Sequence, residues 1–129
     1  MEKLKTKLRR DSISMADNER YTEVHDRDNI VFSLMVVDKE VCSARILPFS
    51  LLLNIHTAPS QEGKGYAKKL LSHIEKIAQE NNAKIMQTDD IDPCDFKAVC
   101  FFKSMNYTLT PIKGNEKFLE GKKILWTDN

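Results

Sequence analysis

Two glycines separated by one residue mark the stretch of this sequence best suited to bind an anion. Gly63 and Gly65 follow an apolar segment, 51–57, and precede a segment with helical periodicity that starts near Tyr66. The first amide groups of a helix have no partner within the helix, and the helix dipole is positive at that end. Glycine also lets the main chain approach phosphate oxygens closely. The loop therefore suits a pyrophosphate, although a strand-to-helix turn without a ligand also explains two glycines.

Two other phosphate-binding motifs do not fit this loop. The nucleotide P-loop pattern G-x-x-x-x-G-K-S/T is absent from the chain. The dinucleotide pattern G-x-G-x-x-G would need a glycine at Lys68, and it belongs to the first strand of its fold, whereas this loop follows several expected strands. Neither of these nucleotide-binding classes is indicated.

The elements that must position the loop can be read from the hydrophobic pattern. Segments 30–37, 41–49 and 51–57 are rich in apolar and β-branched residues, which predicts three strands in an antiparallel meander. Apolar residues then recur at steps of three and four up to Ala78, which predicts an amphipathic helix that ends at Asn81-Asn82. Its solvent side is expected to hold Lys68, Lys69, His73, Glu75, Lys76 and Glu80.

A further strand, 83–88, is expected beyond this helix. Strand, helix and strand form a βαβ unit, so 51–57 and 83–88 should be parallel neighbours with a right-handed crossover. The remaining predicted elements are a helix from about Asp95 to Met105 that stops at Asn106, and a hairpin of strands 107–112 and 122–126 around Gly114-Asn115 and Gly121.

Length and composition indicate one globular domain over residues 1–129. A chain of 129 residues fills about one ordinary core, and 41% apolar with 30% charged residues can both bury a core and solvate a surface. The net charge of +1 provides no overall field to attract nucleic acid or an anionic membrane. The basic segment Lys3-Lys5-Lys7-Arg9-Arg10 is expected to be a solvated strand or a frayed end.

The cysteines and the longest apolar runs bear on the compartment. Cys42, Cys94 and Cys100 are odd in number and show no C-x-x-C spacing, so neither a disulfide framework nor a zinc site is indicated. No apolar run approaches the roughly 20 residues that cross a bilayer. A cytoplasmic protein without a metal, a nucleic-acid partner or a membrane partner is expected.

Two stretches resemble the GCN5-related N-acetyltransferases (GNAT). The run from Ile55 to Leu71 is similar to their motif A, whose core is Q/R-x-x-G-x-G/A: Gly65 and Ala67 match, while Glu62 replaces the Gln or Arg. The run from Ala98 to Tyr107 resembles their second signature, A-x-x-F/L-Y-x-x-x-G-F, with Phe102 at the Tyr position and Asn106 at the Gly position. The resemblance spans about residues 30–126.

The resemblance implies an α+β fold with a mixed, mostly antiparallel twisted sheet of about six strands, one splayed parallel pair and two main helices. Coenzyme A would lie between the splayed strands, its pantetheine arm pairing with the main chain of Ile55 and Thr57 like an added strand. The loop amides would hold the pyrophosphate, with Lys64 as a charge partner. The implied coenzyme-binding residues are Ile55, Thr57, Glu62, Gly63, Lys64, Gly65, Tyr66, Ala67 and Phe102.

The reaction implied is transfer of an acetyl group from acetyl-CoA to a primary amine by direct attack in a ternary complex. A base must take a proton from the amine, and Asp89, Asp90 and His56 are the candidates. A solvated turn is the alternative reading for both aspartates, and for His56 the alternative is a side chain that strand alternation turns away from the cleft. Phe102 cannot donate a proton to the leaving thiolate, so Tyr107 or Tyr66 is considered for that role, with core packing as the alternative.

Departures of this sequence from the family pattern bear on the kind of acceptor and indicate a second class of function. The segment before Ile30 is too short for both of the helices that usually wall the acceptor side, which favours an acceptor amine on a protein or peptide. Glu62 and Phe102 depart from the pattern at functional positions. The alternative function is therefore a non-catalytic coenzyme A binding or protein-interaction module derived from the same fold.

Overall fold

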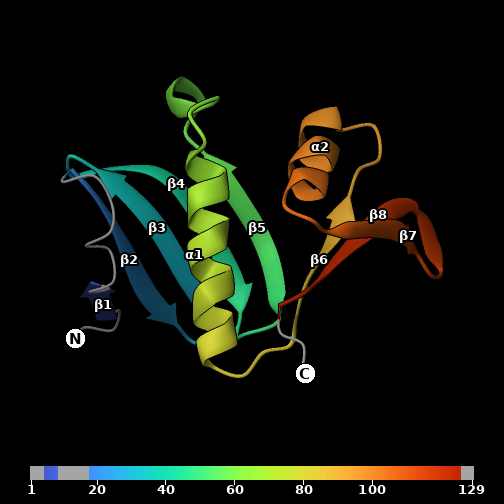
Figure 1. The fold of residues 1–129 in the computed structure, drawn as a ribbon, viewed down its shortest axis with the longest axis horizontal. Helices are drawn as coiled ribbons and strands as arrows, with labels where there is room; N and C mark the ends of the chain where they lie inside the picture. The colour runs from blue at the N-terminus through green and yellow to red at the C-terminus, as the bar shows by residue number, and fades with distance from the viewer. Residues whose placement is uncertain (1–4, 9–17, 126–129) are drawn as a thin grey trace.

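Eight strands and two α-helices follow one another in the computed structural model, which describes residues 5–8 and 18–125 (Figure 1). In chain order the elements are β1 (Lys5–Leu8), β2 (Glu19–Asp26), β3 (Asn29–Val36), β4 (Lys39–Leu47), β5 (Leu51–Thr57), a 3₁₀ helix (Pro59–Gln61), α1 (Tyr66–Glu80), β6 (Ile85–Ile91), α2 (Phe96–Ser104), β7 (Thr108–Ile112) and β8 (Asn115–Ile124).

The strands form one mixed sheet in the order β1-β2-β3-β4-β5-β6-β8-β7. Every neighbouring pair is antiparallel except β5 and β6, which are parallel and joined through α1. The predicted α+β class, with a mostly antiparallel sheet, one parallel pair and two main helices, is confirmed. The sheet has eight strands where about six were expected, because β1 and β2 come from the segment before Ile30, where a solvated strand or a frayed end was expected for the basic segment and no element for β2.

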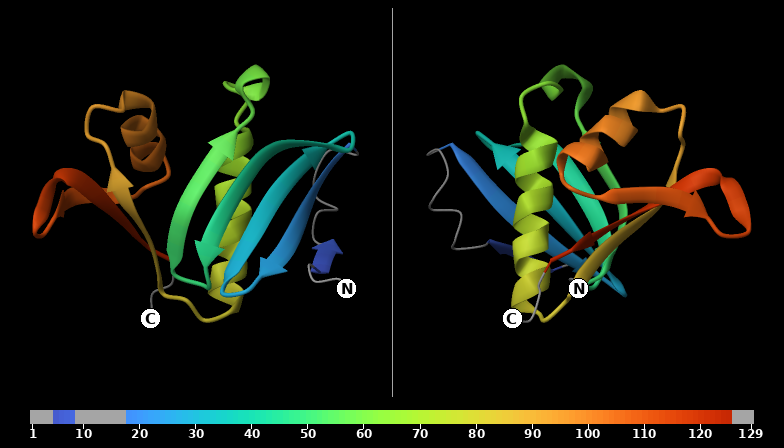
Figure 2. Two further views of the ribbon diagram at one scale, coloured as in Figure 1. Left: turned by 180° about the vertical axis from the view of Figure 1, so that it is seen from behind. Right: turned by 45° about the vertical axis from the view of Figure 1, so that its right-hand side comes forward.

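Helix α1 packs across β3, β4 and β5 and covers the main core (Figure 2). Its apolar residues Leu70, Leu71 and Ile74 are fully buried, as the three- and four-residue spacing predicts. Each such side chain contributes about 1.5–3 kcal/mol through burial. The sheet side of this core consists mainly of Phe32, Leu34, Ile46 and Leu52. The helix ends at Glu80 with Asn81 as its C-cap, and Asn82 takes the left-handed conformation with φ 69°, as expected for a stop of this kind.

Helix α2 lies at the end of the sheet toward which β5 and β6 run (Figure 1). Asp95 caps its first turn, because Oδ1 accepts a hydrogen bond of 3.1 Å from the amide of Ala98. The predicted stop at Asn106 is confirmed, with φ 71°. Both expected helices therefore begin and end within about one residue of their predicted bounds.

The last three strands differ in detail from the expectation. Strand β6 continues to Ile91, so Asp89 and Asp90 lie within it rather than in a turn after it. Strand β8 begins at Asn115, so Gly121 lies inside the strand rather than in the hairpin turn. A Cβ at Gly121 would lie 2.9 Å from Cδ2 of Leu109, so this glycine is explained by close approach of β7.

Some expectations fall wholly or partly outside the described residues. Strand β1 accounts for 5–8 of the basic segment, whereas Lys3, Arg9, Arg10 and Trp126 lie outside. In the part of the chain that the structure describes, no helix has the length and apolar character needed to span a membrane.

Candidate functional site

The parallel pair β5 and β6 is joined only at its lower end (Figure 1). The register pairs Leu51 with Gln87 and Leu52 with Thr88, and the amide of Gln87 donates to the carbonyl of Ser50 at 2.7 Å. Beyond Leu52 the two strands separate, and Figure 2 shows them diverging toward α2. The edge of β5 from 53 to 57 therefore has no strand beside it on this side among the described residues.

Irregularities in both strands explain the separation. Between β4 and β5 the register runs from Ile46↔Leu52 to Arg45↔Asn54, so Leu53 is an extra residue. A bulge of this kind bends and twists its strand, and this one comes directly after the last β5–β6 pair. Strand β6 carries a second irregularity between Thr88 and Ile91, where Asp90 has φ 61°. Each strand thus bends just beyond the point where pairing stops.

A pocket of about 700 Å³, called here the β5 pocket, lies next to the unpaired part of β5. This size is typical of small-molecule sites. The pocket is formed by the end of β5, the glycine loop, the first turns of α1 and one face of α2. Its lining residues are Ile55, His56, Thr57, Gln61, Glu62, Gly63, Gly65, Tyr66, Ala67, Lys68, Asp95, Lys97, Ala98 and Phe101.

The glycine loop has a backbone conformation that favours glycine. Gly63 and Gly65 have φ of 82° and 83°, in the left-handed region, and Gly65 directly precedes the first residue of α1. The first main-chain hydrogen bond of α1 runs from the amide of Lys69 to the carbonyl of Gly65 at 3.1 Å. The amides before it therefore have no helical partner. A Cβ on either glycine would meet no atom within 4 Å, so these donors border open space that suits a diphosphate.

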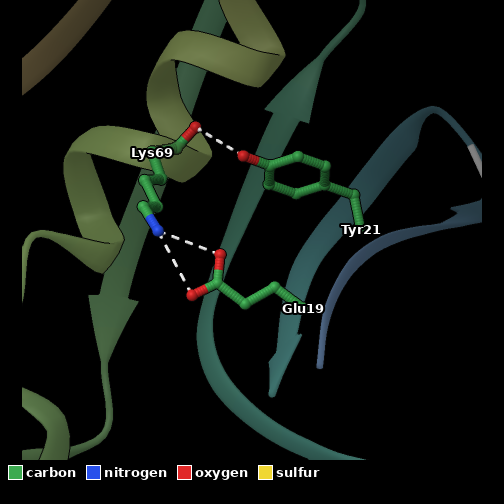
Figure 3. A network of polar contacts seen from close by, with 3 residues as sticks. All are labelled: Glu19, Tyr21 and Lys69. Carbon is green, nitrogen blue, oxygen red and sulfur yellow. Dashed lines mark hydrogen bonds and ion pairs between the residues drawn. The ribbon is translucent and has the colours of Figure 1, made fainter. Parts of the chain in front are cut away.

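Strand β2 holds the first turns of α1 in place (Figure 3). The hydroxyl of Tyr21 donates to the carbonyl of Lys69 at 3.3 Å, and Nζ of Lys69 lies 2.9 Å and 3.2 Å from the two carboxylate oxygens of Glu19. The Tyr21 ring also stacks on His73, with centroids 3.8 Å apart. The predicted surface position of His73 is wrong, since only 7% of it is exposed. Strand β2, which the sequence did not predict, covers this face of the helix.

Glu75 is also buried, so its predicted place on the solvent side of α1 is wrong. Its carboxylate accepts from the Tyr107 hydroxyl at 2.7 Å and pairs with Nζ of Lys123 at 2.8 Å. Burial, and then the negative charge of Glu75, raise the pKa of the Tyr107 hydroxyl above its ordinary value. Tyr107 does not line the β5 pocket, and its hydroxyl donates a hydrogen bond to Glu75. The structure therefore does not bring this candidate acid to the pocket.

Tyr107→Phe is expected to weaken the fold and to change its response to high pH. A hydroxyl whose pKa is raised in the folded state stabilises the fold below its unfolded pKa of about 10 and loses this contribution as the pH rises further. The substitution should cost about 1–2 kcal/mol at pH 7, because Glu75 loses a buried donor. The difference in the free energy of unfolding between the wild type and the variant, measured by urea unfolding, should then narrow above about pH 10. Parallel pH profiles of the two proteins would contradict this.

Other predicted residues lie away from the β5 pocket. Phe102 is only 6% exposed and packs edge-on against Tyr107, with ring centroids 5.5 Å apart, whereas its neighbour Phe101 lines the pocket. Phe102 thus lies in the core and outside the lining of the β5 pocket. The Lys64 ammonium donates to Oε1 of Gln61 at 3.1 Å and is not part of the lining. Asp89 accepts from Gln87 at 2.9 Å outside the pocket, and Asp90 is likewise outside it.

The remaining predicted residues are brought together in the β5 pocket, as the lining given above shows. On β5, the side chain of His56 alternates with those of Ile55 and Thr57, and the Thr57 hydroxyl lies 3.4 Å from Sγ of Cys42 in the core. The sequence reasoning missed the contributions of Gln61, Lys68, Asp95, Lys97, Ala98 and Phe101.

Comparison with known proteins agrees with this geometry. A family model described as the acetyltransferase (GNAT) family matches residues 10–107, and the chain belongs to this family. A search of curated proteins finds no match.

Solved structures share the fold at low sequence identity. A GNAT family acetyltransferase from Elizabethkingia anophelis with acetyl-CoA bound has a TM-score of 0.69 and 12% identity, over 84% of this chain and 99% of that one. The GNAT domain of S. lividans PAT has a TM-score of 0.65 and 16% identity, over 78% of this chain and 64% of that one. PaiA N-acetyltransferase from Thermoplasma acidophilum in complex with coenzyme A has a TM-score of 0.64 and 15% identity, over 74% of this chain and 62% of that one. This chain covers less than two thirds of the last two.

Proposed function

We propose that this chain, as a single domain, moves an acetyl group from acetyl-CoA to a primary amine on a protein or peptide. One observation carries the proposal: the unpaired edge of β5 and the amides of the glycine loop border the same pocket of about 700 Å³. Such a pocket offers a strand-like edge for an amide-rich chain and an anion site at its end. Membership of the acetyltransferase family supports the same reaction class.

In this proposal the coenzyme spans the β5 pocket from the loop to the separated strands. The amides from Gly63 to Ala67 bind the diphosphate, and the main chain of Ile55 and Thr57 pairs with the pantetheine amides. The thioester then lies where β5 and β6 part. The Elizabethkingia and Thermoplasma structures contain acetyl-CoA and coenzyme A, which supports a ligand of this class.

The proposed chemistry is a direct transfer. The neutral amine attacks the thioester carbonyl carbon, a C–N bond forms, the C–S bond breaks, and the thiolate leaves. A coenzyme thiol has a pKa near that of cysteine, about 8.5, so it can leave without a dedicated acid. The proton lost by the amine passes to a base. His56 is the candidate that borders the β5 pocket, while Asp89 and Asp90 on β6 remain the carboxylate candidates.

A second function is favoured by the positions of the aromatic residues. Phe102 has no hydroxyl and the Tyr107 hydroxyl donates to Glu75, so neither supplies a phenol to the β5 pocket. Among the described residues, Tyr66 is the tyrosine that lines it. A protein that binds coenzyme A without transferring the acyl group would fit these positions.

Mass analysis and binding measurements together test the two functions. Intact-mass spectra of basic peptides, proteins and a small primary amine are recorded after incubation with acetyl-CoA and the protein, with protein-free samples as controls. A mass gain of one acetyl group on a peptide or protein is the expected result. Thermal stabilisation by coenzyme A without any mass gain would support the second function. If millimolar coenzyme A does not stabilise the protein and no acetyl group is transferred, both functions are overturned.

A further inference from the structure

An ion pair joins the glycine loop to α2 at the lining of the β5 pocket. Glu62 directly precedes Gly63, and Lys97 lies in the first turn of α2. Nζ of Lys97 is 3.3 Å from Oε1 of Glu62, and both residues line the pocket. Glu62 is the acidic residue found where the family pattern has Gln or Arg. The acid next to the proposed diphosphate position is therefore compensated by a cation from a different element.

This ion pair is easily opened. The two side chains are 89% and 50% exposed, and an exposed pair of this kind favours its closed form by at most about a factor of five. In the part of the chain that the structure describes, the Lys97 ammonium has no other partner. A stronger anion entering the β5 pocket can therefore take Lys97 from Glu62 at little cost.

A diphosphate is such an anion. Its oxygens accept charge-assisted hydrogen bonds that are stronger than those of an exposed carboxylate pair, because loop amides and the start of a helix hold them at the same time. Glu62 repels the same group and competes with it for Lys97, whereas Lys97 attracts it. Asp95 does not compete for Lys97 in this structure, because its Oδ1 caps α2 through the amide of Ala98.

We propose that Lys97 is a phosphate-binding residue of the coenzyme site and that it exchanges its partner, from Glu62 in the empty pocket to the diphosphate in the occupied one. The inference rests on the coenzyme binding proposed above. It assigns to α2 a cation that acts beside the position where the family pattern has Gln or Arg. It also explains how an acid can occupy the position of Glu62 without abolishing the site.

Calorimetric titration of four proteins with coenzyme A tests this exchange: the wild type, Lys97→Gln, Glu62→Gln and the double variant. Lys97→Gln is expected to raise the dissociation constant about tenfold, through loss of a charge-assisted bond. Glu62→Gln should lower it, because the repulsion and the competing partner both disappear. In the Glu62→Gln background Lys97 has no ion pair to give up on binding. Lys97→Gln should therefore raise the dissociation constant by a larger factor there than in the wild-type background, larger by up to about fivefold.

Two controls separate the exchange from general effects. Lys103→Gln removes an exposed cation from the last turn of the same helix, outside the β5 pocket, and should leave binding unchanged. Pantetheine, which lacks the phosphates, should bind all four proteins equally.

The outcomes also separate this inference from the proposed function. If the wild type binds coenzyme A and Lys97→Gln binds it equally well, the inference is wrong and the proposed function stands. An equal cost of Lys97→Gln in both backgrounds would overturn the exchange of partners. If the wild type does not bind coenzyme A at all, both proposals fail.

Discussion

Lys123→Met is expected to lower the free energy of unfolding by about 3 kcal/mol, because it leaves the Glu75 carboxylate buried without its cation. In the wild type this carboxylate is shared between the Lys123 ammonium at 2.8 Å and the Tyr107 hydroxyl at 2.7 Å, and the Glu75 side chain is 10% exposed. A hydroxyl alone cannot offset the cost of burying a full charge. Urea unfolding at pH 7, followed by circular dichroism, measures the difference.

The neighbouring residue provides a matched control for this substitution. Lys122 pairs with Glu120 at 3.6 Å on the surface of the same strand, and its side chain is 52% exposed. Lys122→Met should therefore change the stability by less than about 1 kcal/mol. Replacing both charges, in Lys123→Met with Glu75→Met, should recover much of the loss, since an apolar pair can substitute for a buried ion pair. Equal effects of the two single lysine substitutions would show that the pair does not act as a buried one.

The elements predicted correctly are those whose signals are local. The apolar spacing from Ala67 to Ala78 and the left-handed stops at Asn82 and Asn106 depend on residues within a few positions of one another. The glycine loop was predicted for the same reason, because it needs only two glycines at the start of a helix. Local patterns thus sufficed for the helices and for the position of the glycine loop.

The elements that were missed depend on partners far away in the sequence. Strand β2 includes the buried residues Tyr21, Thr22 and Glu23, two of them polar, so its sequence shows no apolar alternation. His73 and Glu75 look like solvent-facing residues until β2 and β8 supply a stacking ring and an ammonium. Buried polar residues with distant partners cannot be recognised from hydrophobic periodicity alone.

The contribution of α2 to the β5 pocket illustrates the same limit at the site. The family signature drew attention to Phe102, but the pocket is lined by the adjacent Phe101 together with Lys97 and Ala98. Phe101 lies four residues after Lys97 and three after Ala98, so the three share one helix face, which could have been recognised from the sequence. Which face of α2 meets the pocket depends on how α2 packs, and that packing was not encoded locally.

Gly65→Ala is expected to raise the dissociation constant for coenzyme A by about tenfold or more. Gly65 has φ 83° and lines the β5 pocket directly before α1, so a methyl group there disfavours the backbone conformation that presents the loop amides. The folded protein should lose about 1 kcal/mol, because nonglycine residues pay roughly this cost in the left-handed region. Titration calorimetry with coenzyme A and urea unfolding measure the two effects separately.

Gly114→Ala distinguishes a binding role from backbone strain. Gly114 has nearly the same conformation, φ 88°, and its Cβ would likewise meet no atom within 4 Å, but it lies in the turn between β7 and β8, away from the β5 pocket. The two substitutions should therefore cost similar stability, while only Gly65→Ala weakens coenzyme binding. If both variants bind coenzyme A as tightly as the wild type does, the amides around Gly65 do not hold the diphosphate, and the loop is only a turn between β5 and α1.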